Sequence, residues 1–244
     1  MFSIFKAKPV LKDLIPNGTV DIHSHVLHGL DDGAKSIDDT TFLLESMKEI
    51  GFSKVITTPH TTPLVWDNTY DGIVSKLTEV KEQIPELSNS VSLHAASEYL
   101  MDGSFLERLQ SEKLLTLKDN IVLVEMSYIN PPIQLYDILF KLVSKGYVPI
   151  LAHPERYNFY KRDFESFKKL KKAGCLFQLN LLSVTGYYGK DISEVAEYLL
   201  KNDMYDFVGS DIHHEKHIKG FYSKVIVKNY NQIQKIAENN NLTF

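Results

Sequence analysis

The sequence predicts an α/β fold in which seven parallel strands close into a barrel and helices pack outside them. Seven short apolar runs alternate with amphipathic stretches, as expected of repeated βα units. No glycine-rich turn follows the first run, which disfavours an open, doubly wound sheet. The length of 244 residues suits one barrel of about 250 residues. We therefore expect a single domain over residues 1–244, with residues 1–17 as an N-terminal extension.

The candidate strands are rich in β-branched residues, and several are apolar on both faces, which is typical of buried parallel strands. In chain order they cover residues 20–22, 54–58, 91–96, 121–126, 148–152, 175–179 and 206–209.

The stretches between these runs carry helix signals. Ser36 is a candidate N-cap followed by Asp38 and Asp39 in a first turn, and Gly51 marks the end of that helix. Its predicted apolar stripe consists of Phe42, Leu43, Met47 and Ile50.

Further along the chain, Pro131 and Pro132 are expected to open a helix that ends at Gly146. Its predicted apolar face consists of Leu135, Ile138, Leu139, Leu142 and Val143. Residues 163–173 and 192–202 have the same helical character, and residues 222–239 form a predicted closing helix that packs Val225, Ile233 and Ile236.

Composition excludes several classes of protein. A formal net charge of −4 argues against a nucleic-acid partner, which would favour a basic face. The single cysteine, Cys175, excludes an intramolecular disulfide and a cysteine-rich zinc site, and it fits a reducing compartment. The longest apolar runs are far shorter than the roughly 20 residues of a membrane span, and residues 1–13 show no signal peptide. We expect a cytoplasmic protein without membrane insertion.

Nearly every candidate strand ends in a polar side chain, and most of these side chains can bind a metal ion. In chain order the strand-end residues are His23, His25, His60, Glu98, Glu125, His153, Asn180, Asp211 and His213. The carboxyl ends of barrel strands converge on one mouth, where active sites lie. The pattern therefore predicts that residues far apart in the sequence meet in one pocket.

This donor set indicates a cluster of ions. His23 and His25 are two residues apart and point to the same side of a strand, and Asp211 and His213 repeat that spacing. Histidine and carboxylate without thiolate suit Mn, Zn or Fe(II). More than six candidate ligands exceed what one ion can hold, so we expect two or three ions. The alternative, a hydrogen-bonded polar core, would bury several charges without ions at high cost.

Other polar residues leave alternatives open. Either Asp31 or Asp32 returns to the cluster, or the pair forms an acidic turn. Arg156 follows His153 closely and is either a phosphate clamp or a surface ion-pair partner. His94 is predicted to be an interior histidine, and the rim or surface histidines are expected to be His28, His214 and His217.

Nucleophile motifs are missing from the sequence. Cys175 begins an apolar run and lacks the Cys-x5-Arg phosphate loop, which argues against a cysteine-based phosphatase. A Gly-x-Ser-x-Gly elbow and a P-loop are also absent from the sequence.

The motifs together resemble a known family. Asp21-Ile22-His23-Ser24-His25, followed by Gly29-Leu30-Asp31-Asp32-Gly33-Ala34, is similar to the opening of the PHP (polymerase and histidinol phosphatase) superfamily. The later motifs match in order: Thr57-Thr58-Pro59-His60, Glu98, Glu125, Ala152-His153-Pro154-Glu155-Arg156-Tyr157 and Gly209-Ser210-Asp211-Ile212-His213. More narrowly, the chain resembles the bacterial capsule and exopolysaccharide-locus protein-tyrosine phosphatases over roughly residues 18 to 213.

The resemblance implies a distorted (β/α)7, TIM-like barrel with three divalent ions, usually manganese, at the carboxyl strand ends. One ion would bind His23, His25, Glu98 and Asp211, a second Glu98, Glu125 and His153, and a third Asp32, His60 and His213. Asp21 and Arg156 would assist catalysis, with Asp21 orienting a ligand histidine. A metal-bound hydroxide would attack phosphorus in line while Arg156 holds phosphoryl oxygens.

One departure from the family concerns substrate binding. Members often carry a second arginine shortly after the last Asp-x-His motif, where this chain has Lys216, His217 and Lys219. The resemblance implies that one of these three contacts the substrate. A lysine would do so without the bidentate fork of arginine.

The leading hypothesis is a metal-dependent phosphotyrosine phosphatase that acts on the tail of a polysaccharide-export tyrosine kinase. A substrate ring would pack against Tyr128, Tyr157, Tyr187 and Tyr188, unless these are ordinary amphipathic residues. The alternatives are a small-molecule phosphatase acting on histidinol phosphate or a nucleotide, an amidohydrolase-like deaminase, and a non-enzymatic metal-binding module. A deaminase of that kind would have eight strands and no pair of glutamates ending strands three and four.

Overall fold

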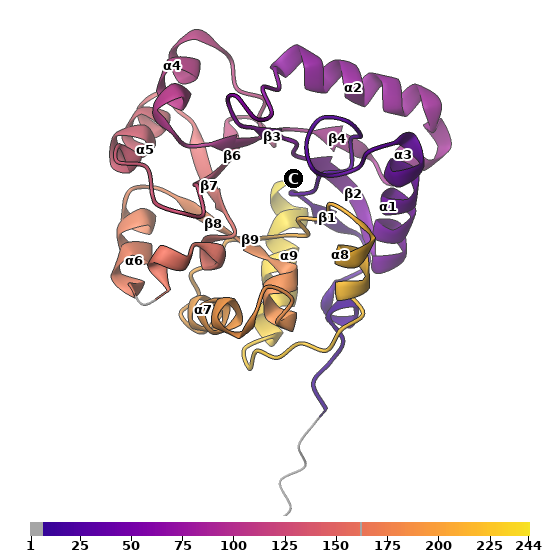
Figure 1. Ribbon diagram of the computed structural model, residues 1–244. Helices are drawn as coiled ribbons and strands as arrows, with labels where there is room; N and C mark the ends of the chain where they lie inside the picture. The colour runs from indigo at the N-terminus through magenta and orange to yellow at the C-terminus, as the bar shows by residue number, and fades with distance from the viewer. Residues whose placement is uncertain (1–6, 162) are drawn as a thin grey trace, which may run out of the picture.

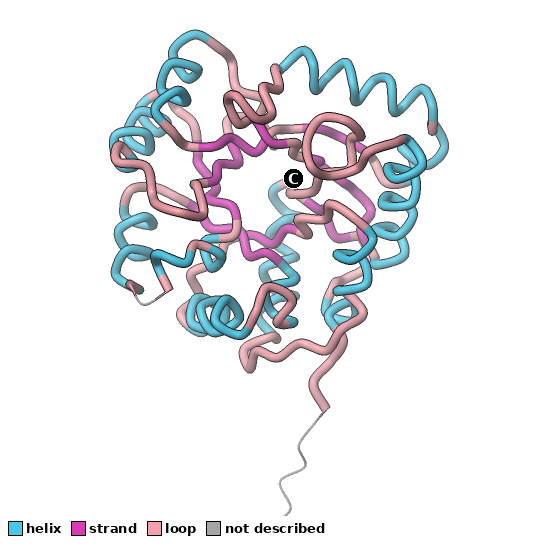
Figure 2. The backbone as a smooth tube through the Cα atoms, viewed as in Figure 1, coloured by secondary structure: helices cyan, strands magenta, loops and turns pink. Residues whose placement is uncertain are grey.

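Two parallel sheets curve into a ring at the centre of the molecule, with the helices outside it (Figures 1 and 2). A computed structural model describes residues 7–161 and 163–244. One sheet has the order β1-β2-β4 and the other β3-β5-β6-β7-β8-β9. The strands are β1 Thr19–Asp21, β2 Phe52–Thr57, β3 His60–Thr61, β4 Leu93–Ala95, β5 Glu98–Leu100, β6 Ile121–Glu125, β7 Val148–Ala152, β8 Leu176–Asn180 and β9 Phe207–Gly209. The predicted parallel α/β barrel is confirmed.

The ring has seven sides although nine strands are assigned among the described residues. β2 pairs with β4, and β3 pairs with β5, so β3 and β5 continue the second and third sides after short interruptions. All seven predicted runs overlap with strands. The third run was placed too early, because Val91 caps a helix and Ser92 has a left-handed backbone (φ 41°).

The first and last sides are joined by a seam instead of a regular strand ladder. At its carboxyl end, Ser24 and Ile212 form an isolated parallel bridge. At its other end, Asn240 of α9 (Asn231–Thr243) lies between the strands. The Asn240 amide donates to the carbonyls of Val20 and Val208, and its oxygen accepts from the Val208 N–H. A side chain from the last helix therefore closes the barrel.

The barrel interior is apolar below the carboxyl strand ends. Its buried core includes Ile22, Ile56, Leu123, Ile150 and Phe207, and Phe244 at the end of α9 packs against it. A larger apolar core fills the space between the sheets and the helices. The polar residues at the strand ends thus lie directly above an apolar layer inside the barrel.

The first helix, α1 (Ile37–Ile50), begins and ends as predicted. Ser36 and Asp39 form a capping box, and Gly51 follows the helix at φ 123°. The predicted apolar stripe is wrong at Phe42, which is 42% exposed, and Leu44 is buried instead. The other helices flanking the ring are α2 Tyr70–Gln83, α3 Pro85–Ser90, α4 Gly103–Ser111, α5 Leu135–Ser144, α6 Phe164–Lys172, α7 Lys190–Lys201 and α8 Glu215–Gly220.

Two predicted helices differ from the structure. α5 begins at Leu135 and not at the prolines, because a proline pushes the residue before it toward extended backbone; Val143 also faces solvent. The predicted helix over residues 222–239 is wrong in its first half. There Val225 is buried in a loop whose backbone bonds to Pro9, and α9 begins only at Asn231.

The predicted N-terminal extension lies partly outside the described residues. Its described part packs on the barrel through a short 3-10 helix, Leu11–Leu14, whose Leu11 and Leu14 are buried. Within residues 7–161 and 163–244, no helix combines the length and hydropathy of a membrane span.

Candidate metal centre

Nine histidine, aspartate and glutamate side chains converge at the carboxyl ends of the strands. Their ligand atoms form four groups, each with all ligand atoms within 4.8 Å of one another. The groups are His25, Asp32, His60 and His213; His23, Glu98 and His153; His23, His25 and Asp211; and His60, Glu98 and Glu125. These nine residues are the nine predicted ligands. The groups differ from the implied sets by placing His153 with His23 and Glu125 with His60.

Glu98 occupies the centre of the cluster. Its Oε2 lies 3.1 Å from His23 Nε2 and 3.2 Å from His60 Nδ1, and its Oε1 lies 3.1 Å from His153 Nε2. Glu98 is fully buried at the start of β5. This position between several imidazoles suits a bridging carboxylate.

Some of the buried polar atoms of the cluster are left without hydrogen bonds. Among the described residues, five buried side-chain atoms have no hydrogen-bond partner, and four belong to the cluster. These four are His25 Nε2, His60 Nδ1, Glu98 Oε1 and His153 Nδ1. A buried polar atom without a partner costs about 1–3 kcal/mol, and buried charges are otherwise paired or coordinate metals. The donor set and its unpaired atoms therefore fit divalent ions.

Electrostatics in the cluster favour ionised carboxylates. Burial opposes ionisation of Glu98, but His23 and His60 hold the pKa of its carboxyl well below the usual 4.5. Burial likewise opposes protonation of His23, yet Glu98 and Asp211 raise the pKa of its imidazole to about 9. The carboxylates thus give the centre a high density of negative charge. In the absence of metal ions, protonated imidazoles balance this charge.

Two side chains orient the ligand histidines. His23 Nδ1 donates to Gln178 Oε1 at 2.8 Å, and His25 Nδ1 donates to Asp31 Oδ2 at 2.6 Å. Each bond places the ring proton on Nδ1 and directs Nε2 into the cluster. Asp31 Oδ2 also accepts from the His60 N–H, so one carboxylate holds two ligand residues.

Asp21 contacts Ser210 and not a histidine ring, in contrast to the role implied for it. Its carboxylate accepts from the Ser210 N–H at 2.8 Å and from the Ser210 hydroxyl at 3.0 Å. Burial raises the pKa of Asp21 to about 6 despite these bonds. Because Ser210 precedes Asp211, Asp21 holds the backbone next to a carboxylate of the cluster, across the barrel seam.

The backbone at two glycines allows this packing. A Cβ on Gly33 would lie 2.1 Å from the carbonyl oxygen of His25, and one on Gly209 would lie 2.7 Å from His23 Cβ. Both contacts are shorter than real Cβ atoms show. The cluster residues His153 (φ 35°) and Asp211 (φ 51°) have left-handed backbones, each costing of order 1–3 kcal/mol.

Arg156 lies beside the cluster. Its Nη1 donates to Asp211 Oδ2 at 2.6 Å, and its guanidinium carbon lies 4.1 Å from the Tyr188 ring centroid and 5.0 Å from that of Tyr128. Asn180 donates to the same Asp211 oxygen at 2.7 Å. Arg156, which is 19% exposed, lines a cavity of about 260 Å³. Five residues of the metal cluster line the same cavity: Asp32, His60, His153, Asp211 and His213.

The predicted aromatic rim is correct only in part. Tyr128 and Tyr188 flank Arg156, whereas Tyr157 is buried and its hydroxyl bonds to the backbone of Met126 and Ala152. Tyr187 packs edge-on against His217.

The three candidates for the second substrate contact separate clearly. His217, predicted at a loop rim, is buried in α8 and lines the cavity. Its Nδ1 accepts from the His213 N–H at 3.1 Å, and burial lowers the pKa of its imidazole to about 4. Lys219 pairs with Glu215, and Lys216 is exposed away from the cavity lining.

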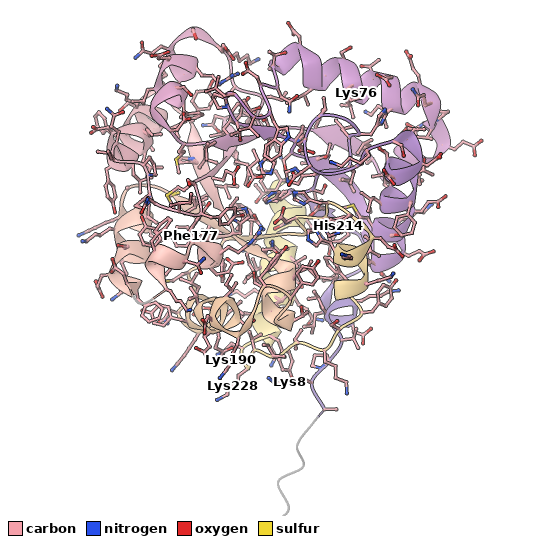
Figure 3. The ribbon with its side chains drawn as sticks, in the orientation of Figure 1. Lys8, Lys76, Phe177, Lys190, His214 and Lys228 are labelled. Carbon is pink, nitrogen blue, oxygen red and sulfur yellow. The ribbon has the colours of Figure 1, made fainter. Side chains whose placement is uncertain are left out.

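The remaining histidines and the cysteine lie outside the centre. Figure 3 labels His214, which lies beside α8 near the central cluster, whereas Lys190 and Lys228 lie at the outer edge. His94 is exposed on β4 and bonds to Ser92, so the predicted interior position is wrong. His28 is partly buried against Thr40. Burial raises the pKa of the Cys175 thiol to about 12, which disfavours a thiolate nucleophile.

Comparison with known proteins agrees with this centre. A family model described as capsular polysaccharide synthesis, CpsB/CapC, matches residues 19–239. The chain belongs to this family. It is 27% identical over 200 residues to the tyrosine-protein phosphatase CpsB of Streptococcus pneumoniae, covering 80% of this chain and 82% of the relative. It is 26% identical over 200 residues to the tyrosine-protein phosphatase YwqE of Bacillus subtilis, covering 81% and 78%.

A solved structure extends the likeness of this CpsB/CapC member to three dimensions. It comes from work on YwqE from Bacillus subtilis and CpsB from Streptococcus pneumoniae, described as unique metal-dependent tyrosine phosphatases. The TM-score is 0.76 at 25% identity, over 83% of this chain and 84% of the other.

Three contributors to the centre of this CpsB/CapC member escaped the sequence analysis. Gln178 is a buried polar residue within the otherwise apolar strand β8, and this interruption of the apolar run is visible in the sequence. Asp31 was weighed as a ligand, but its contact is to the ligand imidazole. Trp66 stacks on His60 with centroids 4.9 Å apart, and it lies in a loop whose path the sequence does not indicate.

Proposed function

We propose that this chain hydrolyses phosphotyrosine at the nine-residue cluster, as a metal-dependent tyrosine-protein phosphatase of the CpsB/CapC family. The observation that carries the proposal is the shared cavity. Arg156, His217 and the cluster open onto the same space, so a phosphoryl group held by ions can also meet a guanidinium. Arginine suits this task because its planar fork matches phosphoryl oxygens.

The cluster would hold three divalent ions, with manganese the expected metal and iron or zinc the alternatives. The ligands would be His23, His25, Asp32, His60, Glu98, Glu125, His153, Asp211 and His213. Divalent ions bound there act as Lewis acids and activate water near neutral pH. Three divalent cations against four ligand carboxylates leave a net charge of +2, which complements a phosphate ester near −2.

The chain's own side chains orient the substrate. Tyr188 and Tyr128 hold the guanidinium of Arg156 by stacking, so its remaining N–H groups are free to donate to phosphoryl oxygens. His217 accepts at Nδ1 from the backbone, which places its proton on Nε2, and that N–H serves as the second donor. The phenolate leaving group has a pKa of about 10, so the demand for a strong general acid is modest.

The substrate we propose is the phosphorylated tail of a tyrosine kinase that serves polysaccharide export. Two facts support it: the family is defined by capsular polysaccharide synthesis, and two relatives are named tyrosine-protein phosphatases. A small-molecule phosphatase would use the same ligands, so substrate rates must separate the two.

A steady-state assay of manganese-loaded protein tests the function. We expect phosphotyrosine peptides to be hydrolysed faster than histidinol phosphate, a nucleotide monophosphate or a phosphoserine peptide. His60→Ala should lose most turnover, whereas His94→Ala, which removes an exposed imidazole, should retain it. Thiol alkylation should have no effect, because Cys175 is buried. Faster hydrolysis of histidinol phosphate would reassign the substrate, and no phosphatase activity in folded, metal-loaded protein would refute the proposal.

A further inference from the structure

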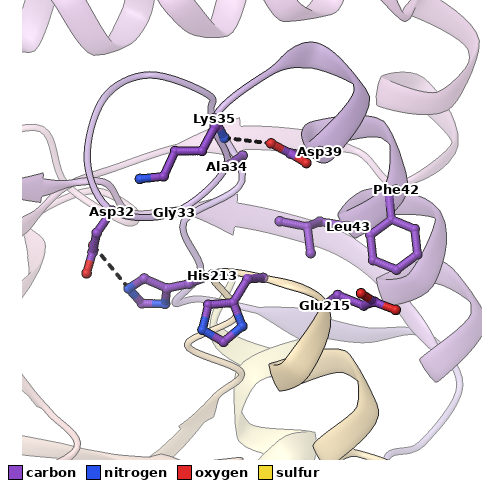
Figure 4. Close-up of a pocket in the computed structure, with 10 residues that line it drawn as sticks. Asp32, Gly33, Ala34, Lys35, Asp39, Phe42, Leu43, His213 and Glu215 are labelled. Carbon is purple, nitrogen blue, oxygen red and sulfur yellow. Dashed lines mark hydrogen bonds and ion pairs between the residues drawn. The ribbon is translucent and has the colours of Figure 1, made fainter.

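A second cavity opens beside the metal centre. It measures about 570 Å³, within the roughly 300–1,000 Å³ of ligand pockets, and lies between the loop after β1, helix α1 and the start of α8 (Figure 4). Asp32, His213 and His214 line both this cavity and the smaller one that contains Arg156. The two spaces therefore share a wall made of His214 and two residues of the metal cluster, Asp32 and His213.

One side of this cavity is apolar. Phe42 and Leu43 of α1 line it (Figure 4), and of the two only Phe42 is substantially exposed, since Leu43 is buried in the core. Phe42 is 42% exposed although it stands on a helix whose neighbouring residues, such as Leu44 and Met47, are fully buried. An aromatic ring that α1 leaves outside the core is thus presented next to the reaction site.

The charged side chains around the apolar wall are already engaged. Asp39 accepts from the backbone N–H groups of Lys35 and Ser36 in the capping box of α1. Glu215 pairs with Lys219, and the Lys35 ammonium bonds to the carbonyl of Asp31. An uncharged, apolar group meets the available surface better than a charged one.

We propose that this cavity is a specificity subsite that receives an apolar side chain of the substrate polypeptide near the phosphotyrosine. The inference rests on the proposed phosphatase function and adds to it a preference for certain residues near the phosphotyrosine of the substrate. Residues of an extended peptide are spaced about 3.3 Å apart. With the phosphotyrosine side chain inserted at the metal centre, a residue one to three positions away reaches the adjoining cavity. A free phosphate ester would leave it empty.

Matched peptides test the subsite. One series carries leucine at each of the three positions before and after phosphotyrosine in turn, with serine elsewhere, and the reference peptide carries only serine. We expect leucine at one of these positions to raise kcat/KM about tenfold, mainly through KM, because apolar contact is made equally in the ground and transition states. A non-hydrolysable phosphonate version of the same peptides should show the same ratio in Kd.

Variants of the apolar wall assign the preference to the cavity. In Phe42→Ser the ratio of kcat/KM between the best leucine peptide and the serine peptide should fall toward one, and in Phe42→Leu it should persist. Phe140→Ser is the matched control, since Phe140 is 71% exposed on α5 and does not line this cavity. Circular dichroism and metal content verify that each variant is folded and loaded.

The outcomes separate the subsite from the function. A wild-type preference that Phe42→Ser removes and Phe140→Ser retains supports the subsite. Equal rates on all peptides, or a preference that survives Phe42→Ser, would overturn it while leaving the phosphatase in place. If the folded, metal-loaded wild type turned over no phosphotyrosine compound, both the subsite and the phosphatase function would be refuted.

Discussion

The imidazole rings of His23 and His25 are aimed into the centre by bonds made on their far sides, to Gln178 and Asp31. Such partners fix the tautomer and the orientation of a ligand and raise its basicity. Asp31 has the larger task, because it also binds the backbone N–H of Gly33 and of His60. One carboxylate therefore holds the loop after β1, a histidine ring and the start of β3 in register.

Replacing Asp31 by asparagine should weaken metal binding without removing a ligand. We expect the affinity for manganese to fall about 10–100-fold, because the His25 ring loses its charged acceptor. Titration calorimetry measures the affinity. Asp38→Asn, an exposed change in the first turn of α1, serves as the control. Equal affinities in wild type and Asp31→Asn would show that the bond does not tune the centre.

Arg156→Lys should lower turnover of aryl phosphates at least about tenfold. One lost charge-assisted contact is worth roughly 1.5–3 kcal/mol, and a lysine also loses the stacking between Tyr128 and Tyr188. Metal content should stay unchanged in elemental analysis, since Arg156 is no ligand. Arg108→Lys on α4 makes the same change in a surface ion pair. Wild-type rates for Arg156→Lys would take this residue out of the reaction.

At the scale of elements, the seam between β1 and β9 is a join of the barrel without a regular strand ladder. Asn240 supplies three hydrogen bonds where a strand ladder would supply them, and Asp21 supplies two more through Ser210. These bonds set the distance between His23 on one side and Asp211 on the other. The last helix thereby contributes to the geometry of a centre it does not touch.

Asn240→Ala should destabilise the fold by about 3 kcal/mol. The change leaves the buried Val20 carbonyl and both backbone groups of Val208 without partners. Urea unfolding measures the loss as a lower midpoint at an unchanged slope. Asn239→Ala, at the preceding residue, removes a single hydrogen bond to the Asp206 carbonyl and should cost far less. Similar midpoints for the two variants would contradict the role of Asn240 in the seam.

How well each helix or strand could be predicted depends on how strongly its own residues indicate it. Runs such as β6 and β7 and the capping box of α1 are local features, and sequence reasoning located them. β3 and β5 are two and three residues long, too short to show a period, and pairing with their neighbours defines them. Phe42 shows the limit for helices, because its apolarity predicts burial whereas its outward position reflects the cavity beside α1.

For the whole molecule, strand order brings ligands from distant parts of the sequence to one mouth. Eight of the nine cluster residues were predictable because each follows a recognisable strand run, whereas Asp32 was selected only by the resemblance to a known family. The Asn240 seam and the position of Trp66 were not predictable, since they depend on tertiary contacts with Val20, Val208 and His60. Gln178 interrupts an apolar strand pattern, but its partner His23 lies on a strand far away in the sequence. Elemental analysis of protein purified without chelator should find two to three ions per chain. Fewer than one ion in fully active protein would contradict the cluster.

Proton release should accompany metal binding by the folded chain. In the metal-free protein burial opposes protonation of His23, but Glu98 and Asp211 outweigh it and raise the pKa of the imidazole from 6.5 to about 9. A ligand imidazole must be neutral, so an ion displaces this proton at pH 7.5. Calorimetry in buffers of different ionisation enthalpy should detect about one or more protons released per chain, and a buffer-independent enthalpy would contradict the shift.

The same raised pKa should make the metal-free protein lose stability at alkaline pH. Between pH 6.5 and about 9 the folded chain holds a proton that the unfolded chain does not, so the stabilisation is complete below pH 6.5 and disappears as pH rises through 9. Urea unfolding of chelated protein should therefore show a falling free energy of unfolding over this range. Manganese-loaded protein should not share that decline, because its imidazole is neutral and bound throughout. His23→Gln should make the curve of the chelated protein less steep, although part of the slope should remain because the pKa values of His25 and His60 are also raised by nearby carboxylates. An unaltered slope in that variant would assign the dependence to other groups.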